Sequence, residues 1–220
     1  MPLSTVLGAQ SLVQPAVCTT ATRPASPYTG QAIYDTTTAT QLIWNGTAWV
    51  GTGGGLVCVK AETAFSAVTS FTADNVFTST YTNYLMHMTW TVSTANQPTT
   101  VLRVGGVDAT SNYNYQRGIA TTTTISNDRS ASQSSILLAS YASVASVLSA
   151  MTVTIYQPQL STPTFFNAFN AAIDSSLTTP YNANFSGNHS TATAYDGIKF
   201  SVPSGTMTGT YAIYGYAKTV

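Results

Sequence analysis

The chain has 220 residues, of which only 6% are charged, and its formal net charge is zero. Soluble proteins ordinarily carry about a quarter charged residues, so this composition is typical of a protein built into a permanent assembly, or of a secreted adhesin or lectin domain. Seven Lys and Arg residues spread along the whole chain form no basic stripe, which argues against nucleic-acid binding. No window of about twenty residues lacks polar interruptions, so we expect no membrane insertion.

Residues 1–22 are predicted to form an extended arm. Their apolar side chains are scattered without a sustained period, and Pro15 and a Thr-rich lead end the segment. Such an arm is normally disordered unless something holds it, so we expect it to anchor the chain on other subunits of an assembly. Residues 1–14 lack the basic start of a signal peptide, which predicts synthesis in a bacterial cytosol.

Residues 23–52 predict a small antiparallel meander, which we call the collar. Polar and apolar residues alternate over residues 31–35 and 41–44, and Asn45-Gly46 is a strong signal for a tight turn before a third short strand. A ribbon of two or three strands is only marginally stable in water, so its apolar side chains need a covering surface. We expect that surface to come from another copy of the chain. The candidate interface residues are Ile33, Tyr34, Leu42, Trp44 and Trp49.

A glycine-rich run, GTGGG at residues 51–55, follows the collar, and residues 53–55 are predicted to form a linker. Cys18 and Cys58 flank the collar. Two free thiols are expected in a reducing cytosol, and a disulfide that closes the collar is the alternative. Neither cysteine lies in a CxxC motif, so we expect no zinc site, and no other metal or cofactor.

Residues 56–220 are predicted to form a jelly-roll-like β-sandwich, so the expected fold class is all-β. Strand patterns recur at regular intervals, and eight of them match the strand number of a jelly roll. The eight segments are residues 56–61, 65–71, 84–93, 100–104, 113–121, 148–156, 197–202 and 210–217. Residues 132–147 and 165–177 are less regular and can each hold a helical turn, and residues 181–193 are expected to form a long loop.

Two motifs resemble a known class of protein. Residues 23–50 contain the pattern R-P-x-S-P-x-x-G-Q-x-I-Y-D-T-T-T-x-x-x-x-x-W-N-G-x-x-W and are similar to collar modules near the N-termini of tailed-bacteriophage virion proteins. Residues 196–218, DGIKFSVPSGTMTGTYAIYGYAK, are similar to the last two strands of the β-sandwich heads of phage fibre, minor tail and capsid-decoration proteins. The resemblance implies a non-enzymatic, usually trimeric structural or adsorption component of a virion.

Catalysis is not expected. Hydrolysis of a polysaccharide needs two carboxylates flanking the scissile bond, whereas the acidic residues of the head lie singly in or beside predicted loops. Those residues are Glu62, Asp74, Asp108, Asp128, Asp174 and Asp196. His87 lies on the polar face of its strand and His189 in the predicted loop, so both are expected at the surface. The sequence contains no phosphate-binding or nucleophile motif.

Exposed aromatic rings remain as candidates for recognition. A flat ring beside Asn or Gln side chains suits the face of a sugar, and several rings are predicted near loops. The candidate glycan contacts are Tyr113, Tyr115, Tyr181 and Phe185. The alternative is that these rings pack at a trimer seam or beneath loops.

Two functions stay open: a structural module anchored by residues 1–22 and joined into a homotrimer through the collar, and a receptor-binding, lectin-like adhesin for host surface glycan.

Overall fold

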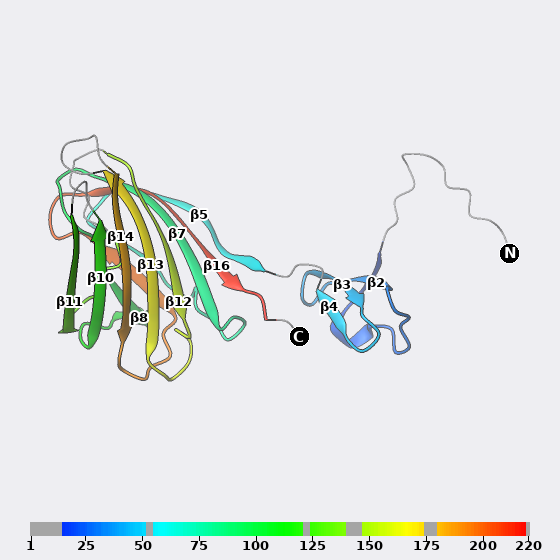
Figure 1. The fold of residues 1–220 in the computed structure, drawn as a ribbon. Helices are drawn as coiled ribbons and strands as arrows, with labels where there is room; N and C mark the ends of the chain where they lie inside the picture. The colour runs from blue at the N-terminus through cyan, green and yellow to red at the C-terminus, as the bar shows by residue number, and fades with distance from the viewer. Residues whose placement is uncertain (1–14, 52–54, 121–123, 140–146, 174–179, 219–220) are drawn as a thin grey trace. The chain divides into compact units, whose positions relative to one another are not determined.

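The computed structural model of the chain describes residues 15–51, 55–120, 124–139, 147–173 and 180–218, without the side chains of residues 180 and 181 (Figure 1). The chain divides into two units, one containing the residues up to Gly54 and the other spanning Gly55–Lys218. Sixteen strands and one short 3₁₀ helix make up the regular structure of the described residues. The all-β fold class is therefore confirmed. No helix in these ranges is long and apolar enough to span a membrane.

The N-terminal unit is a four-stranded sheet in the order β1–β2–β3–β4. Its elements are β1 (Ala16–Cys18), the 3₁₀ helix η2 (Thr20–Thr22), β2 (Ala32–Asp35), β3 (Thr40–Trp44) and β4 (Trp49–Gly51). Strands β2, β3 and β4 form the expected antiparallel meander, and Asn45 Oδ1 accepts hydrogen bonds from the N–H groups of Thr47 (2.9 Å) and Ala48 (2.8 Å) in its turn. β1 runs parallel to β2, so residues 16–18 join the sheet instead of the predicted arm. Residues 1–14 of that arm lie outside the described residues.

A buried carboxylate ties the segment before β2 to the turn after it. Asp35 accepts hydrogen bonds from Arg23 Nε (2.7 Å), Thr20 Oγ1 (2.9 Å) and the N–H group of Thr37 (2.8 Å). Burial by itself raises the pKa of Asp35, but these donors outweigh that effect and lower the pKa from 3.8 to about 2. Asp35 therefore stays ionised at neutral pH and holds η2 against the sheet.

The apolar side chains of the collar fall into two groups. Ile33 and Leu42 lie opposite each other on β2 and β3 and are 0% and 7% exposed. The expectation that these two need a second copy to cover them is wrong, because the single chain already shields them. Trp44 and Trp49 pair across β3 and β4, with ring centroids 5.6 Å apart in an edge-to-face arrangement, and both stay partly exposed. Tyr34 is 38% exposed, so it and the two tryptophans remain accessible to a partner.

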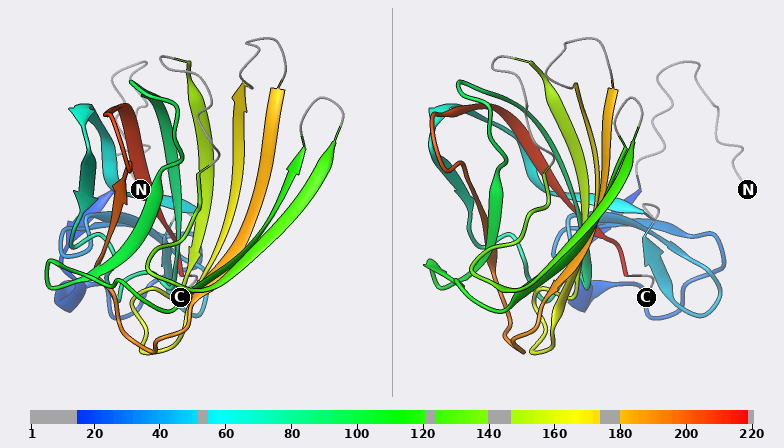
Figure 2. Two further views of the ribbon diagram at one scale, coloured as in Figure 1. Left: turned by 90° about the vertical axis from the view of Figure 1, so that its left-hand side faces the viewer. Right: turned by 60° about the vertical axis from the view of Figure 1, so that its left-hand side comes forward.

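The second unit, the head, contains an eight-stranded and a four-stranded sheet (Figures 1 and 2). The large sheet has the order β11–β10–β14–β13–β12–β7–β16–β5, and the small sheet has the order β6–β15–β8–β9. Neighbouring strands in both sheets are antiparallel. The strands are β5 (Leu56–Val68), β6 (Ser70–Ala73), β7 (Asn83–Val92), β8 (Thr99–Val104), β9 (Val107–Asp108), β10 (Tyr113–Ala120), β11 (Ile125–Gln133), β12 (Ser149–Tyr156), β13 (Thr164–Ile173), β14 (Pro180–His189), β15 (Gly197–Ser201) and β16 (Met207–Tyr216).

An apolar core lies between the two sheets of the head. Figure 2 shows the small sheet lying against one face of the large sheet, which confirms the expected sandwich. Among the most deeply buried side chains are Tyr84, Met86, Met88 and Trp90 of β7, and Leu102, Ile198 and Phe200 of the small sheet. The strand predicted at residues 84–93 is confirmed as β7, whose alternate side chains from Tyr84 to Val92 are buried. We call the other face of the large sheet, which points away from this core, the outer face.

The large sheet of the head has eight strands and the small sheet has four, so the described part of the head contains more strands than the eight expected. The helical turn expected in residues 165–177 is wrong, because residues 165–173 belong to β13; residues 174–179 lie outside the described residues. The loop expected at residues 181–193 is wrong as far as residue 189, where β14 ends. Of residues 132–147, the described ones complete β11 and form a bridge from Ile136 to Thr100, and residues 140–146 lie outside the described ranges. In the Asn-rich segment of β14, pairing with neighbouring strands outweighs a low intrinsic strand propensity.

Candidate functional site

The outer face of the large sheet carries exposed aromatic side chains on β13. Alternate residues of a strand point to opposite sides, so Phe165, Asn167 and Phe169 face away from the core while Phe166 and Ala168 are buried in it. Phe165 is 54% exposed and Phe169 is 65% exposed. Large apolar side chains exposed in the interior of a sheet are candidates for contact with a ligand or partner.

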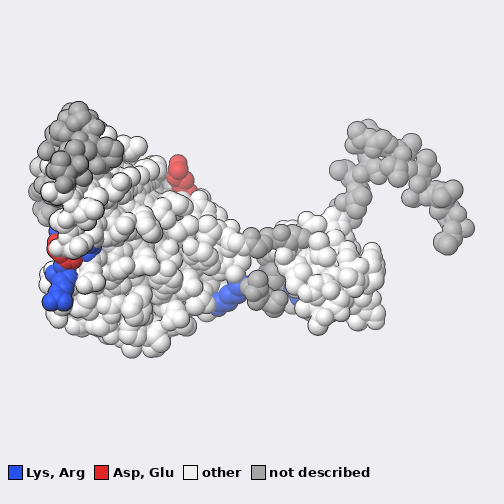
Figure 3. Space-filling view, viewed as in Figure 1, with Lys and Arg blue, Asp and Glu red and all other residues white. Residues whose placement is uncertain are grey.

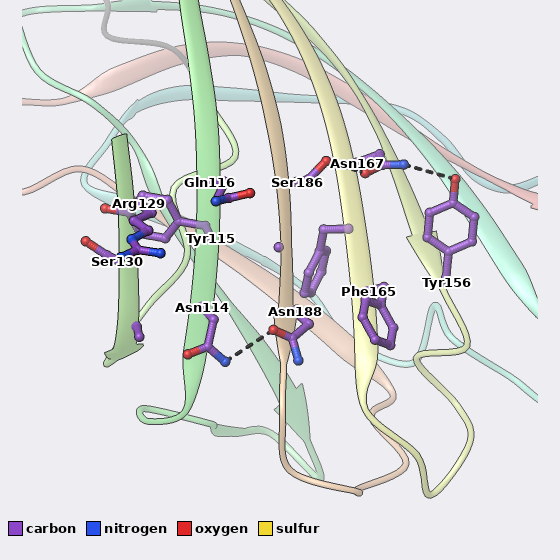
Figure 4. Close-up of a pocket in the computed structure, with 13 residues that line it drawn as sticks. Asn114, Tyr115, Gln116, Arg129, Ser130, Tyr156, Phe165, Asn167, Ser186 and Asn188 are labelled. Atoms are coloured by element: carbon purple, nitrogen blue, oxygen red, sulfur yellow. Dashed lines mark hydrogen bonds between the residues drawn. The ribbon is translucent and has the colours of Figure 1, made fainter. Parts of the chain in front are cut away.

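Phe165 lies in a groove that crosses the outer face. The groove has a volume of about 710 Å³ and is formed by β12, β13, β14, β10 and the edge strand β11 (Figure 4). The strand register places Tyr156 of β12 on one side of Phe165 and Asn188 of β14 on the other. Figure 4 shows the rings of Phe165 and Tyr156 toward one end of the groove and Arg129 of β11 toward the other. Between the ends lie the polar side chains of Asn114, Gln116, Asn167, Ser186 and Asn188.

Hydrogen bonds between neighbouring strands orient the polar side chains of the groove. Asn114 Nδ2 donates to Asn188 Oδ1 (3.2 Å), and Ser186 Oγ donates to Asn167 Oδ1 (2.8 Å). Asn167 Nδ2 donates to the hydroxyl oxygen of Tyr156 (3.5 Å). A side-chain amide has two N–H donors and an oxygen with two lone pairs, so these bonds use only part of its capacity. The groove therefore presents oriented hydrogen-bond donors and acceptors beside the rings of Phe165 and Tyr156.

The groove is almost free of charge. Of the described residues that line it, Arg129 is the one with a charged side chain, and none carries a carboxylate. Figure 3, which has the view of Figure 1, shows the few charged side chains of the visible face of the head near its edges. A surface of this kind binds polar ligands through hydrogen bonds and ring contacts rather than through ion pairs.

Most carboxylates of the head are held by other protein groups. The sequence candidates with such partners are Asp74, Asp108, Asp128 and Asp196. Arg103 of β8 pairs with Asp74, with 2.7 Å from Nε to Oδ1, and also with Asp108. Lys199 Nζ lies 2.7 Å from Asp108 Oδ2. Asp74, Asp108, Arg103 and Lys199 form an ion-pair network at the small sheet, whereas Asp128 pairs with Arg117 between β10 and β11 of the large sheet. None of these carboxylates lines the groove.

No metal centre is assembled in the described ranges: no three His, Cys, Asp or Glu side chains there lie close enough to hold an ion. Glu62 is exposed on β5, and Asp174 lies outside the described residues. Cys18 and Cys58 are free thiols in the structure, one in the N-terminal unit and one in the head.

Two of the four predicted glycan contacts are wrong. Tyr113 is 0% exposed and Phe185 is 2% exposed, because β10 and β14 turn these side chains into the core. The Tyr113 hydroxyl accepts a hydrogen bond from the N–H group of Leu102 (2.8 Å), and burial raises the pKa of Tyr113. Tyr115 is half-buried and lines the groove, whereas the side chain of Tyr181 lies outside the described residues.

Phe165, Phe169 and Tyr156 were not among the sequence candidates. A signal was present in the order Thr-Phe-Phe-Asn-Ala-Phe-Asn-Ala over residues 164–171. Apolar residues fall on both faces of this segment, however, so its period does not distinguish a strand from a short helix. The rings became candidates only when the sheet showed which face was left uncovered.

The two histidines have different surroundings. His87 is exposed on the outer face, as predicted, and its Nδ1 lies 3.2 Å from Thr152 Oγ1. The expectation of a surface position for His189 is wrong, since this side chain is 2% exposed at the end of β14. Its Nδ1 lies 3.1 Å from the Tyr195 hydroxyl, and its ring packs edge to face on Tyr113, 4.5 Å between centroids. Burial lowers the pKa of His189, so this imidazole is neutral at pH 7.

The groove on the outer face thus offers ring faces, amides, hydroxyls and one guanidinium group. Groups of these kinds bind a polar ligand mainly through hydrogen bonds and ring contacts. Comparison of the chain with protein-family models, with curated proteins and with solved structures finds no match in any of the three.

Proposed function

We propose that the head is a non-enzymatic binding module that recognises an uncharged glycan on the outer face of its large sheet. The observation that supports this most directly is the groove in which the rings of Phe165 and Tyr156 stand beside a row of oriented amides. The proposed ligand is of the class that the sequence suggested, but the proposed site lies on the face of a sheet instead of in loops.

The chemistry of the groove suits a sugar in two respects. The C–H face of a sugar ring is apolar and packs against an aromatic ring, and Phe165 exposes more than half of its surface for such a contact. Sugar hydroxyl groups both donate and accept hydrogen bonds, as do the amides of Asn114, Asn167 and Asn188. Because no carboxylate lines the described groove, a neutral ligand is favoured over a cationic one.

A glycan array of neutral oligosaccharides, followed by calorimetric titration of the ligands found, tests this function. Phe165→Ala should weaken binding about tenfold or more, because truncating a central aromatic anchor costs on the order of 1.4 kcal/mol or more. Tyr28→Ala removes another exposed ring, 71% accessible in the N-terminal unit, and is the matched control that should bind normally. Unchanged affinity of Phe165→Ala, or a parent protein that binds no glycan, would refute the proposal.

We also propose that the chain is a structural or adsorption component of a bacteriophage virion, of the fibre, minor tail or capsid-decoration type. Support comes from the resemblance of residues 23–50 and 196–218 to such proteins and from the low content of charged residues, 6%. In this setting the part of the arm that precedes β1, residues 1–14, contacts other virion subunits and the head meets the host surface. Deletion of residues 1–14 spares β1 and should abolish incorporation into particles. Normal incorporation of the deletion variant would refute this anchoring role.

Self-association of the collar into a homotrimer accompanies this proposal. Its support is the partial exposure of Trp44 and Trp49 and the 38% exposure of Tyr34. Tyr34→Lys places an unpaired charge at this surface and should convert the trimer to monomer without unfolding the collar. Light scattering at micromolar concentration measures the change, and a parent protein that is monomeric would contradict the proposal.

A further inference from the structure

Besides Phe165, which lies in the groove, the outer face carries a second exposed aromatic ring on β13. Phe169 is 65% exposed, and its register partners are Thr152 on β12 and Asn184 on β14. It lies in a second hollow of about 640 Å³, which is also lined by His87. None of the described residues that line this hollow is Asp, Glu, Lys or Arg. The second hollow therefore repeats the chemistry of the first, with an aromatic ring surrounded by amide and hydroxyl groups.

A line of polar side chains on β14 connects the two hollows. The register partners along β14 and β13 are Asn188 with Phe165, Ser186 with Asn167, and Asn184 with Phe169. A third hollow, also of about 640 Å³, shares Ser186 with the first hollow and Asn184 with the second. Its remaining lining on β10 and β11 includes the ion pair of Arg117 with Asp128 and the side chain of Arg129, so the charged groups of this face lie at its edge, away from the rings of β13. The three hollows therefore join into one band on the outer face, with rings on β13 and hydrogen-bonding groups on β14 beside them.

The spacing of the rings sets the size of the ligand. Phe165 and Phe169 are four positions apart on one strand, which separates their Cα atoms by about 13 Å at roughly 3.3 Å per residue. A single sugar ring is too small to touch both. We propose that the ligand is a linear, uncharged oligosaccharide that lies along β13, with one sugar against each ring and the sugars between them bonded to β14. This inference rests on the proposed glycan-binding function and specifies its ligand class.

The composition of the band favours a sugar chain over a second copy of this protein. The buried centre of a stable protein interface is a contiguous apolar patch depleted in polar groups. Here Asn167 separates the two rings, and the amides and hydroxyls of β14 lie beside them. An apolar partner would bury the donors and acceptors that the bonds between these side chains leave unused, at a cost, whereas the hydroxyls of a sugar chain can pair with them.

Chain-length dependence of binding tests the inference. The probes are maltose to maltohexaose, cellobiose to cellohexaose, and chitobiose to chitohexaose, together with any array ligand and its shorter fragments. In the series that binds, affinity should rise about tenfold or more from two sugars to six, as the second ring is engaged. Phe169→Ala and Phe165→Ala should each remove that gain, because each leaves one ring of the pair in place. Tyr28→Ala again serves as the control for loss of an exposed ring.

The outcomes separate this inference from the proposed function. Equal affinity for short and long chains, or a hexasaccharide affinity that Phe169→Ala leaves unchanged, overturns the linear ligand while glycan binding itself stands. Absence of glycan binding by the parent protein overturns both. Concentration-dependent self-association that Phe169→Ala abolishes, in a protein that binds no glycan, assigns the band to contact between copies of the chain instead.

Discussion

Truncating two adjacent phenylalanines of β13 should affect different properties: Phe166→Ala should mainly lower stability, and Phe165→Ala should mainly weaken glycan binding. Phe166 is 1% exposed and Phe165 is 54% exposed, on opposite faces of the large sheet. Burying a Phe side chain removes about 150–200 Å² from water, or about 4–5 kcal/mol at roughly 25 cal/mol per Å², and core Phe truncations cost about 3–5 kcal/mol. Phe165 buries only about half of its surface, and solvent can fill the space it leaves, so Phe165→Ala should cost less than about 2 kcal/mol.

Differential scanning calorimetry of the full-length variants measures the difference. In a domain of this size each kcal/mol lowers the Tm by about 2–4 °C, so Phe166→Ala should lower the Tm of the head by roughly 10 °C. Phe165→Ala should lower it by about 5 °C or less and should lose glycan affinity. A shift of one residue in strand register exchanges the two faces. A larger loss of Tm in Phe165→Ala than in Phe166→Ala would therefore refute the register of β13 and the position of the groove.

Three further perturbations have defined outcomes. The pKa of His189 lies below its ordinary value of 6.5 in the folded head, so the unfolded chain binds the proton more readily and stability should fall as the pH drops below 6.5. His189→Gln should flatten that dependence in calorimetry. Asp35, with its pKa lowered from 3.8 to about 2, stabilises the collar above pH 3.8 and loses this effect as the pH falls toward 2. Asp35→Asn should destabilise the collar in urea and remove that acid dependence, as followed by tryptophan fluorescence. Gly187→Ala would drive a methyl group into the Asn114 carbonyl oxygen and Ile136, so it should cost about 1–3 kcal/mol and weaken glycan binding by displacing β10.

Specific results would contradict each of these expectations. Equal stability of the head at pH 7.5 and pH 5 would show that His189 is not held as a buried neutral ring. A collar that unfolds at the same urea concentration after Asp35→Asn would remove the proposed stabilising role of its carboxylate. A parent-like Tm of Gly187→Ala would mean that β10 and β14 do not approach each other as closely at this position as the structure has them.

Strands with clean alternation were predictable from the sequence. The prediction of residues 84–93 corresponds to β7 (Asn83–Val92), and that of residues 148–156 corresponds to β12 (Ser149–Tyr156). β14 was expected to be a loop because its Asn-rich sequence has low intrinsic strand propensity. Its strand conformation depends on pairing along most of its length, with β10 on one side and β13 on the other. That stabilisation comes from residues distant in sequence and leaves no local pattern.

The wrong prediction of a loop in place of β14 also affected the choice of candidate site residues. Composition suggested aromatic rings beside amides as a sugar-binding surface, and the structure contains such a surface at Phe165 and Asn188. The rings chosen from the sequence were partly wrong because loops were expected where strands lie. In a strand, neighbouring residues face opposite sides, so Phe185 points into the core while the flanking Asn184 and Ser186 point outward.

The sequence by itself determined the fold class, the collar meander and the nearly uncharged character of the surface, because these follow from alternation, turn residues and composition within short segments. Only the tertiary structure decided which rings meet solvent. The small sheet covers one face of the large sheet, and the core that forms there leaves the outer side chains of β13 exposed. Pairing of β10, β14, β13 and β12 then brings Asn114, Asn188, Phe165 and Tyr156 side by side, although they are far apart along the chain. The site is a product of long-range strand pairing, which no local pattern encodes.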